Sequence, residues 1–342
     1  MKTIAKSQTT GIGSLPHANV DAALEYSFRH AIPFLPQIPA RNPWEYLLPQ
    51  ALEHLPGLSV ERDGSTKLDQ GIWTSQMFRV GERLNRAFDL ASSDPEAFFA
   101  FEPTASVASS WQPFLWELTE RRTKVAKIQI AGPLTCQWVL SRDTDPELSG
   151  QVFKLVLARS LAMTRRLAQT GAKPLIFLDE PALYLLRPDV PAHVQALVEL
   201  KVVVQTLQRE GARVGIHCCS DTAWSSVLGT GIDVLSFDWE LSAASFARNV
   251  AREHLEAFET RGGTLSLGVV PTGREGWTHS FDPRARVKEI SQWAQDHSSL
   301  RALARGALLT PACGLALSRL ETTELVLEQL DETAAHLSEA LA

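Results

Sequence analysis

Eight short β-prone runs recur along the 342-residue chain, and helical stretches lie between most of them. The runs are Thr9–Leu15, Pro33–Ile38, Ala126–Ala131, Pro174–Asp179, Arg213–Cys219, Asp233–Asp238, Thr264–Val270 and Ala307–Cys313. Strands that alternate with helices pair in parallel through right-handed crossovers. Eight such units favour a closed barrel over an open doubly wound sheet. We therefore expect an α/β fold, a single (β/α)8 TIM barrel domain that spans residues 1–342.

The helical stretches have typical start signals. Asn19 is a residue type that commonly caps the first turn of a helix, and three of the later stretches begin with proline, which the first turn tolerates. The 146–171 stretch has apolar residues at helical spacing. We predict helices at Val20–Ala31, Pro146–Gly171, Pro191–Gly211, Pro283–Trp293 and Thr322–Leu341.

The connection between expected strands 2 and 3, about residues 39–124, is much longer than an ordinary βα loop. It must therefore contain structure of its own. Leu58–Trp73 predicts a hairpin about Asp63-Gly64, and helices are expected near Gln76–Leu90 and Pro95–Phe101. We expect this insertion to lie over the barrel mouth and to shape the substrate site.

Composition excludes several classes of protein. The net charge is −6 and no Lys/Arg-rich run occurs, which disfavours nucleic-acid binding. Four cysteines are too few for a disulfide scaffold. The longest apolar runs have the length of strands, and the first residues lack the apolar core of a signal peptide. We expect a cytoplasmic protein with neither a membrane nor a nucleic-acid partner.

A candidate metal site begins with the segment His217-Cys218-Cys219. Side chains alternate faces along a strand, so His217 and Cys219 share one face and Cys218 points away. Cys313 ends the last strand, and its end shares the barrel mouth with the ends of strands 5 and 6. One imidazole and two thiolates leave a tetrahedral zinc ion with one open position, as in catalytic zinc sites.

The fourth ligand is open between two carboxylates. Asp238 ends the intervening strand, and Glu240 has the same parity and competes with it. The other two cysteines, Cys136 and Cys218, are interpreted as packing residues, because buried cysteines often behave as small apolar side chains.

Six segments together resemble one enzyme family, the cobalamin-independent methionine synthases. They are TTGIGSLP, KIQIAGPLTCQW, PLIFLDEPAL, IHCCSD, GIDVLSFDWE and LLTPACGLAL. The first resembles that family's TTTIGSFP, and others resemble its GPVT strand, its QIDEPAL, its zinc-binding His-x-Cys segment and its NPDCGL. They occur in family order between Thr9 and Leu317, and they correspond to the C-terminal catalytic half of the full-length enzyme.

The resemblance implies roles for individual residues. His217, Cys219 and Cys313 match the zinc ligands, and Asp238 occupies the place of a ligating Glu. Asp179 would hold the amino group of the substrate homocysteine, and Gly13 and Ser14 would hold its carboxylate. Glu45, in the segment RNPWEYL, matches the Glu of a Glu-Tyr pair that helps to hold the amino group. For Asp179, a helix N-cap is the structural alternative. His279, in a loop after strand 7, is a further candidate, as the group that protonates a leaving group.

These matches predict a zinc-dependent methyltransferase that methylates homocysteine to methionine. Zinc binding removes the proton from a substrate thiol, and the thiolate is the form that attacks a methyl group. Short forms of the family are thought to use a methylated corrinoid protein as donor instead of methyltetrahydrofolate.

Three alternatives stay open. One is a corrinoid-dependent methyltransferase acting on another thiol, such as coenzyme M. Another is uroporphyrinogen decarboxylase, which uses no metal, and the last is a non-catalytic protein stabilised by zinc. The zinc set argues against the decarboxylase, and amino-acid anchors argue against coenzyme M, which has no amine.

Overall fold

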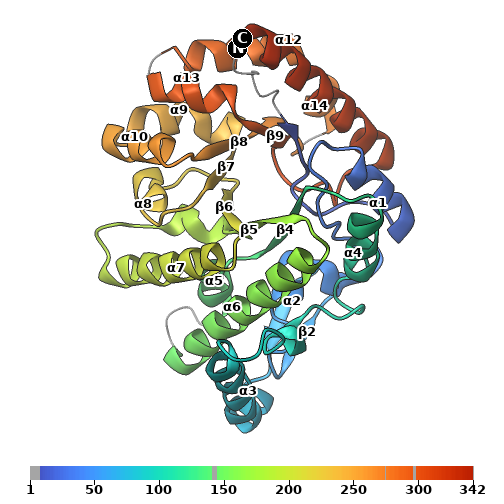
Figure 1. Cartoon of the computed structure of the whole chain (residues 1–342), viewed down its shortest axis with the longest axis vertical. Helices are drawn as coiled ribbons and strands as arrows, with labels where there is room; N and C mark the ends of the chain where they lie inside the picture. Colours follow the sequence, from blue (N-terminus) through green and yellow to red (C-terminus); the bar gives the residue numbers. More distant parts are fainter. Residues whose placement is uncertain (1–7, 141–144, 274, 296–297, 342) are drawn as a thin grey trace.

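A curled parallel sheet forms the centre of the molecule (Figure 1). The structure is a computed structural model that describes residues 8–140, 145–273, 275–295 and 298–341. Within these ranges the sheet has seven strands in the order β1-β9-β8-β7-β6-β5-β4. Their bounds are β1 Gln8–Thr9, β4 Val125–Ala131, β5 Lys173–Asp179, β6 Arg213–Cys218, β7 Val234–Asp238, β8 Thr264–Val270 and β9 Leu308–Pro311.

The expected second strand, Pro33–Ile38, does not form a ladder. It makes one isolated parallel bridge to β4, between Phe34 and Lys127, and another to the segment after β1, between Ser14 and Gln37. Prolines at positions 33, 36 and 39 interrupt the row of backbone N–H donors that a continuous ladder needs. The prediction of a closed eight-stranded barrel is therefore confirmed only in part, as a curled seven-stranded parallel sheet.

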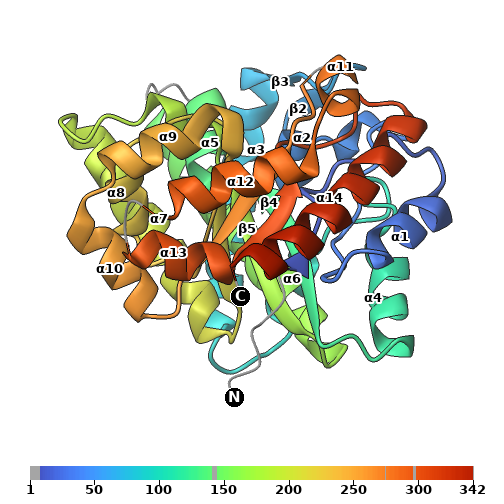
Figure 2. The same cartoon turned by 90° about the horizontal axis from the view of Figure 1, so that it is seen from above.

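Helices surround the sheet (Figure 2). The five helices predicted outside the insertion are present, with ends shifted by at most a few residues. Asn19 caps α1 as predicted, because its side chain accepts a hydrogen bond of 3.0 Å from the Ala22 N–H. The helices outside the insertion are α1 Val20–Phe28, α5 Pro133–Leu140, α6 Pro146–Gln169, α7 Pro191–Arg209, α8 Trp224–Leu228, α9 Trp239–Asn249, α10 Arg252–Thr260, α11 Glu275–His279, α12 Pro283–Trp293, α13 Ser298–Arg305 and α14 Leu320–Ala340. None of the helices in the described ranges is both long and apolar enough to cross a membrane.

The long insertion contains the predicted hairpin and a group of helices. The hairpin pairs β2 with β3 in antiparallel register, and the segment predicted as a helix near residue 100 is instead a short 3-10 turn. The elements are η1 Pro43–Glu45, α2 Leu47–Ala51, β2 Leu58–Val60, β3 Thr66–Leu68, α3 Gln70–Leu90, η2 Phe99–Phe101 and α4 Trp111–Glu120.

Arg159 attaches this insertion to the sheet layer. It lies on α6 and is fully buried, and its guanidinium donates to the Phe101 carbonyl at 3.1 Å and to the Glu53 carboxylate at 2.6 Å. It also donates to the backbone carbonyl of Gln50. A buried guanidinium is tolerated because each of these acceptors replaces lost water. The insertion therefore has a defined position beside the site described next.

Candidate functional site

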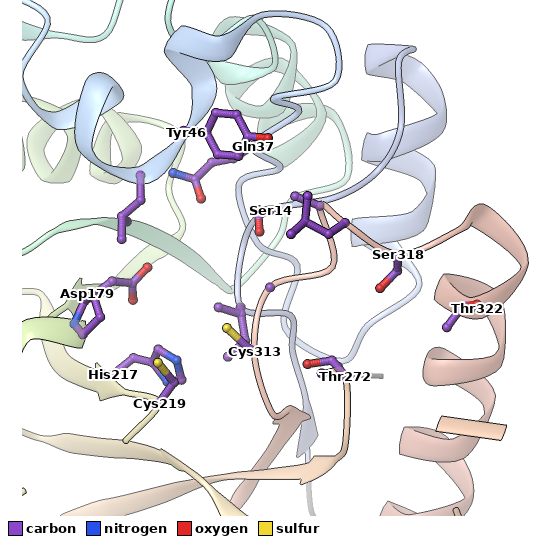
Figure 3. Close-up of a pocket in the computed structure, with 17 residues that line it drawn as sticks. Ser14, Gln37, Tyr46, Asp179, His217, Cys219, Thr272, Cys313, Ser318 and Thr322 are labelled. Carbon is purple, nitrogen blue, oxygen red and sulfur yellow. The ribbon is translucent and has the colours of Figure 1, made fainter. Parts of the chain in front are cut away.

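A cavity of about 550 Å³ opens at the carboxyl ends of the strands. Figure 3 shows its lining residues, which come from five places: the strand ends, the turn after β1, the 33–38 segment, the insertion, and the chain from the end of β9 into the first turn of α14. The polar lining residues include Ser14, Gln37, Tyr46, Asp179, His217, Cys219, Thr272, Cys313, Ser318 and Thr322. Active sites of parallel α/β proteins lie at this end of the strands. The sequence places six reactive side chains at strand ends or turns there. Asp238 is not among the lining residues, and the other five line the cavity: Ser14, Asp179, His217, Cys219 and Cys313.

His217, in β6, presents one free ring nitrogen. It is 5 % exposed, and its Nδ1 is 3.0 Å from the Ser236 hydroxyl. Its Nε2 is buried and has no hydrogen-bond partner among the described residues. Burial lowers the pKa of His217 to about 3, so the ring is neutral at physiological pH. A neutral imidazole whose second nitrogen is held by an outer group is the usual form of a metal-binding histidine.

Cys219 and Cys313 interact directly through their thiols. The Cys313 thiol donates a hydrogen bond to the Cys219 sulfur, which lowers the pKa of Cys219 to about 7 and raises that of Cys313. The two residues follow β6 and β9 and are far apart in sequence, as the strand-end prediction required. Cys219 therefore has substantial thiolate character near neutral pH.

The other two cysteines are buried outside the cavity. The Cys136 sulfur lies 3.9 Å from the Ala131 carbonyl, and the Cys218 sulfur lies 3.2 Å from the Ser220 carbonyl. Burial raises the pKa of Cys218 to about 12 and also raises that of Cys136. Both are protonated thiols in apolar surroundings, as the packing interpretation expects.

The side chains do not form a metal cluster in their present positions. In the described part of the chain, no group of three or more His, Cys, Asp or Glu side chains is arranged so that it could hold a metal ion. His217, Cys219 and Cys313 nevertheless line the same cavity. Their donor atoms, one unpartnered imidazole nitrogen and two interacting sulfurs, are of the kind that binds zinc. Zinc binding thus stays a prediction.

The two candidates for a fourth ligand have other partners. Asp238 caps α9, because its Oδ1 accepts a hydrogen bond of 3.2 Å from the Leu241 N–H. Its charge raises the pKa of Cys219, so the two groups are near each other. Glu240 lies in α9 and forms an ion pair with Arg286. Of the two carboxylates, Asp238 has the closer electrostatic relation to the thiol pair.

Asp179 ends β5 and faces the cavity with an unsatisfied oxygen. The residue is 6 % exposed, and its Oδ1 has no hydrogen-bond partner in the described structure. Burial raises its pKa to about 7, and the nearby positive charge of Lys127 opposes this effect. The alternative role as a helix cap falls to Glu180 instead, which occupies the cap position of the 3-10 turn η3 (Pro181–Leu185) and whose side chain binds the first turn of α5. Asp179 is therefore available to a ligand.

Ser14 is placed by two close backbone approaches. A Cβ atom at Gly314 would come within 2.0 Å of the Ser14 hydroxyl, and one at Gly13 would come within 2.5 Å of the Gln129 amide. A side chain at either position would therefore displace Ser14 or Gln129. Ser14 lines the cavity, whereas Gly13 is not among its lining residues.

Lys127 and Gln129 were missed in the sequence and support the site from inside the sheet. Lys127 is 1 % exposed, and its Nζ donates to the Ile12 carbonyl at 2.6 Å and to Gln129 Oε1 at 3.0 Å. Gln129 Nε2 donates to the Leu35 carbonyl at 2.7 Å. Lys127 and Gln129 thus connect β4 to the segment after β1 and to the 33–38 segment. The alternation of polar and apolar residues in KIQI was the signal for these inward side chains.

Glu45 and His279 do not belong to the set of residues that line the cavity. Glu45 is buried, and its oxygens accept hydrogen bonds from the Ile38 N–H at 2.9 Å and the Ser109 hydroxyl at 2.6 Å. The adjacent Tyr46 faces the cavity instead. His279 ends the short helix α11 and is exposed. The roles suggested for Glu45 and His279 stay predictions.

Comparison with known proteins yields similarity in structure only. No family model matches the chain, and no curated protein matches it. Among solved structures, a methyltransferase from Methanosarcina mazei aligns with a TM-score of 0.54 over 96 % of this chain and 95 % of that one. The two sequences are 15 % identical. This similarity shows a common α/β fold.

Proposed function

We propose that the protein is a zinc-dependent methyltransferase that transfers a methyl group to the thiol of homocysteine and so forms methionine. The observation that carries the proposal is the convergence of His217, Cys219, Cys313 and Asp179 on one cavity at the strand ends. The fold that the chain shares with the methyltransferase from Methanosarcina mazei supports the same reaction class. The resemblance of the sequence to the cobalamin-independent methionine synthases supports homocysteine as the methyl acceptor.

The metal-binding side chains would be His217, Cys219 and Cys313, with Asp238 as the exchangeable fourth group. A bound zinc ion would lower the pKa of a substrate thiol, so that the thiolate is present at neutral pH. Two cysteine sulfurs keep such a site electron-rich. Ser236 holds the His217 ring at Nδ1, which fixes the ring with Nε2 free.

The amino-acid part of the substrate would be held by Asp179 and Ser14. An ammonium group would supply the hydrogen-bond donor that Asp179 Oδ1 lacks, in a charge-assisted hydrogen bond. Ser14 offers a hydroxyl to the carboxylate. Holding both groups directs the substrate sulfur toward the cysteine pair, which is the positioning contribution to catalysis.

The methyl donor would approach over Tyr46 and Pro181. These residues, with Leu47, separate the cavity from a second hollow of about 560 Å³, whose walls include Trp138 and Tyr184. We propose a methylated corrinoid protein as the donor. The second hollow is open to the surface beside exposed apolar side chains, among them Tyr184 and Leu185.

One experiment tests acceptor and donor together. Zinc-loaded protein is offered homocysteine with methylcobalamin, a methylated corrinoid protein or methyltetrahydrofolate, and methionine is quantified. Coenzyme M replaces homocysteine in a parallel series. Methylation of coenzyme M but not of homocysteine would favour the alternative, a corrinoid-dependent methyltransferase that acts on coenzyme M. If addition of the thiol released no proton in a zinc-dependent manner, the proposal would be contradicted.

A further inference from the structure

Gln37 is a buried amide that faces the cavity beside Ser14. It is 3 % exposed, and it lines the cavity with Ser14 and Asp179 (Figure 3). Its backbone pairs with the turn after β1, since the Gln37 N–H donates to the Gly13 carbonyl at 3.0 Å and the Leu15 N–H donates to the Gln37 carbonyl at 2.8 Å. Its Cα is therefore fixed relative to the Ser14 turn.

The orientation of the Gln37 amide follows from its neighbours. Gln50 Nε2 donates to the backbone carbonyl of Val107 at 3.0 Å, and a carbonyl can only accept. Gln50 Oε1 must then face Gln37, whose Nε2 donates to it at 2.6 Å. This chain of bonds leaves Gln37 Oε1 without a hydrogen-bond partner among the described residues. Because Gln37 lines the cavity, this oxygen can accept a hydrogen bond from a bound ligand.

We propose that Gln37 is a specificity residue whose Oε1 accepts a hydrogen bond from the ammonium group of an α-amino-acid thiol. This assignment rests on the proposed function. The ammonium and carboxylate of an α-amino acid share one carbon, so the groups that bind them must lie close together. Ser14 and Gln37 are bridge partners on adjacent segments. The Glu45 oxygens, in contrast, are already bonded to Ile38 and Ser109.

Arg159 gives the assignment a structural basis. It binds the backbone carbonyl of Gln50 and the carboxylate of Glu53, and so holds α2 in place. Gln50 in turn holds Gln37. The insertion thus contributes to substrate selection through a buried polar connection as well as through the surface of Tyr46. Polar networks of this kind restrict a side chain to one orientation.

The test compares two thiols that differ at one group. L-Homocysteine and 4-mercaptobutanoate have the same thiol and carboxylate, but the second lacks the amine. Binding of each to the zinc-loaded full chain is measured by calorimetry for wild type, Gln37→Leu and Asp179→Asn. Gln37→Leu should weaken homocysteine binding about tenfold or more and change 4-mercaptobutanoate binding less than about twofold.

The outcomes separate the two proposals. If wild type does not prefer homocysteine over 4-mercaptobutanoate, the proposed acceptor is wrong and the assignment is wrong with it. If wild type and Gln37→Leu prefer homocysteine equally, only the Gln37 assignment is overturned. Should Gln37→Leu fail to fold, Gln37→Glu keeps an acceptor oxygen at this position, and it should retain the preference for the amine. Loss of that preference would also overturn the assignment.

Discussion

The carboxylate of Glu180 is held by Thr135 through both the backbone and the side chain. Glu180 Oε2 accepts from the Thr135 N–H at 2.7 Å and from its hydroxyl at 2.6 Å, while Oε1 accepts from the Leu134 N–H at 3.0 Å. These bonds connect the end of β5 to the first turn of α5. Because Glu180 performs this capping, its neighbour Asp179 remains directed at the cavity.

The pH dependence of stability should reveal this buried carboxyl. Burial raises the pKa of Glu180 to about 7, above its ordinary value of 4.5. The folded chain therefore holds the proton more tightly than the unfolded chain, and the contribution to the free energy of unfolding is greatest below about pH 4.5 and lost as the pH rises through about 7. Glu180→Gln lacks this titration. We expect the stability of wild type relative to the variant to fall across that range by at most about 3 kcal/mol. Urea denaturation at several pH values measures it, and parallel pH profiles would contradict it.

Cysteine substitutions should separate the proposed metal ligands from the packing residues. Cys219→Ser and Cys313→Ser should lose most of the bound zinc and all methyl transfer, because each removes a thiolate from the cavity. Cys136→Ser should retain zinc, since Cys136 is buried beside the Ala131 carbonyl and does not line the cavity. Metal analysis of the purified variants, with circular dichroism to check the fold, gives the result. Equal zinc loss in all three variants would refute the ligand assignment.

Replacement of Lys127 should destabilise the fold. Lys127→Met removes the donor for the Ile12 carbonyl and for Gln129 Oε1, and both acceptors stay buried without that partner. We expect a loss of about 1–3 kcal/mol in the free energy of unfolding, measured by urea denaturation. Lys67→Met is the matched control, because Lys67 is exposed and forms only a surface ion pair with Glu61. A loss in the control as large as in Lys127→Met would show that the buried bonds are not the cause.

The sequence predicted the strands of the sheet well where apolar residues predominate and no proline interrupts the strand. β4 to β8 lie within one residue of their expected bounds, because apolar residues, many of them β-branched, predominate in these strands and turn signals flank them. The 33–38 segment was harder, since its apolar residues suggest a strand but its prolines prevent a ladder. The sequence could not show that the Glu45 carboxylate accepts a hydrogen bond from the Ser109 hydroxyl, because the two residues are 64 positions apart.

For the candidate site, too, positions along strands could be predicted from the sequence, whereas contacts between distant segments could not. Residues at or near the ends of predicted strands, such as Asp179 and His217, were found from their positions together with the motifs in which they occur. Gln37 and Lys127 were not, because their importance depends on partners in distant segments. Asp238 was expected at a strand end and is there, but its capping bond to Leu241 depends on where α9 begins. Strand ends can therefore be predicted from a sequence more reliably than the hydrogen bonds that orient side chains between them.

The tip of the hairpin should influence ligand binding through Tyr46. Gly64 has a φ of +81°, and a Cβ atom there would come within 2.3 Å of the Tyr46 ring, which lines the cavity. Gly64→Ala should therefore displace the ring and weaken homocysteine binding severalfold. Gly211→Ala is the matched control, because Gly211 has a similar φ of +85° but no atom within 4 Å of the added carbon. Both variants should lose about 1 kcal/mol of stability from the left-handed backbone alone. If calorimetry shows equal affinities in the two variants, the hairpin does not position Tyr46.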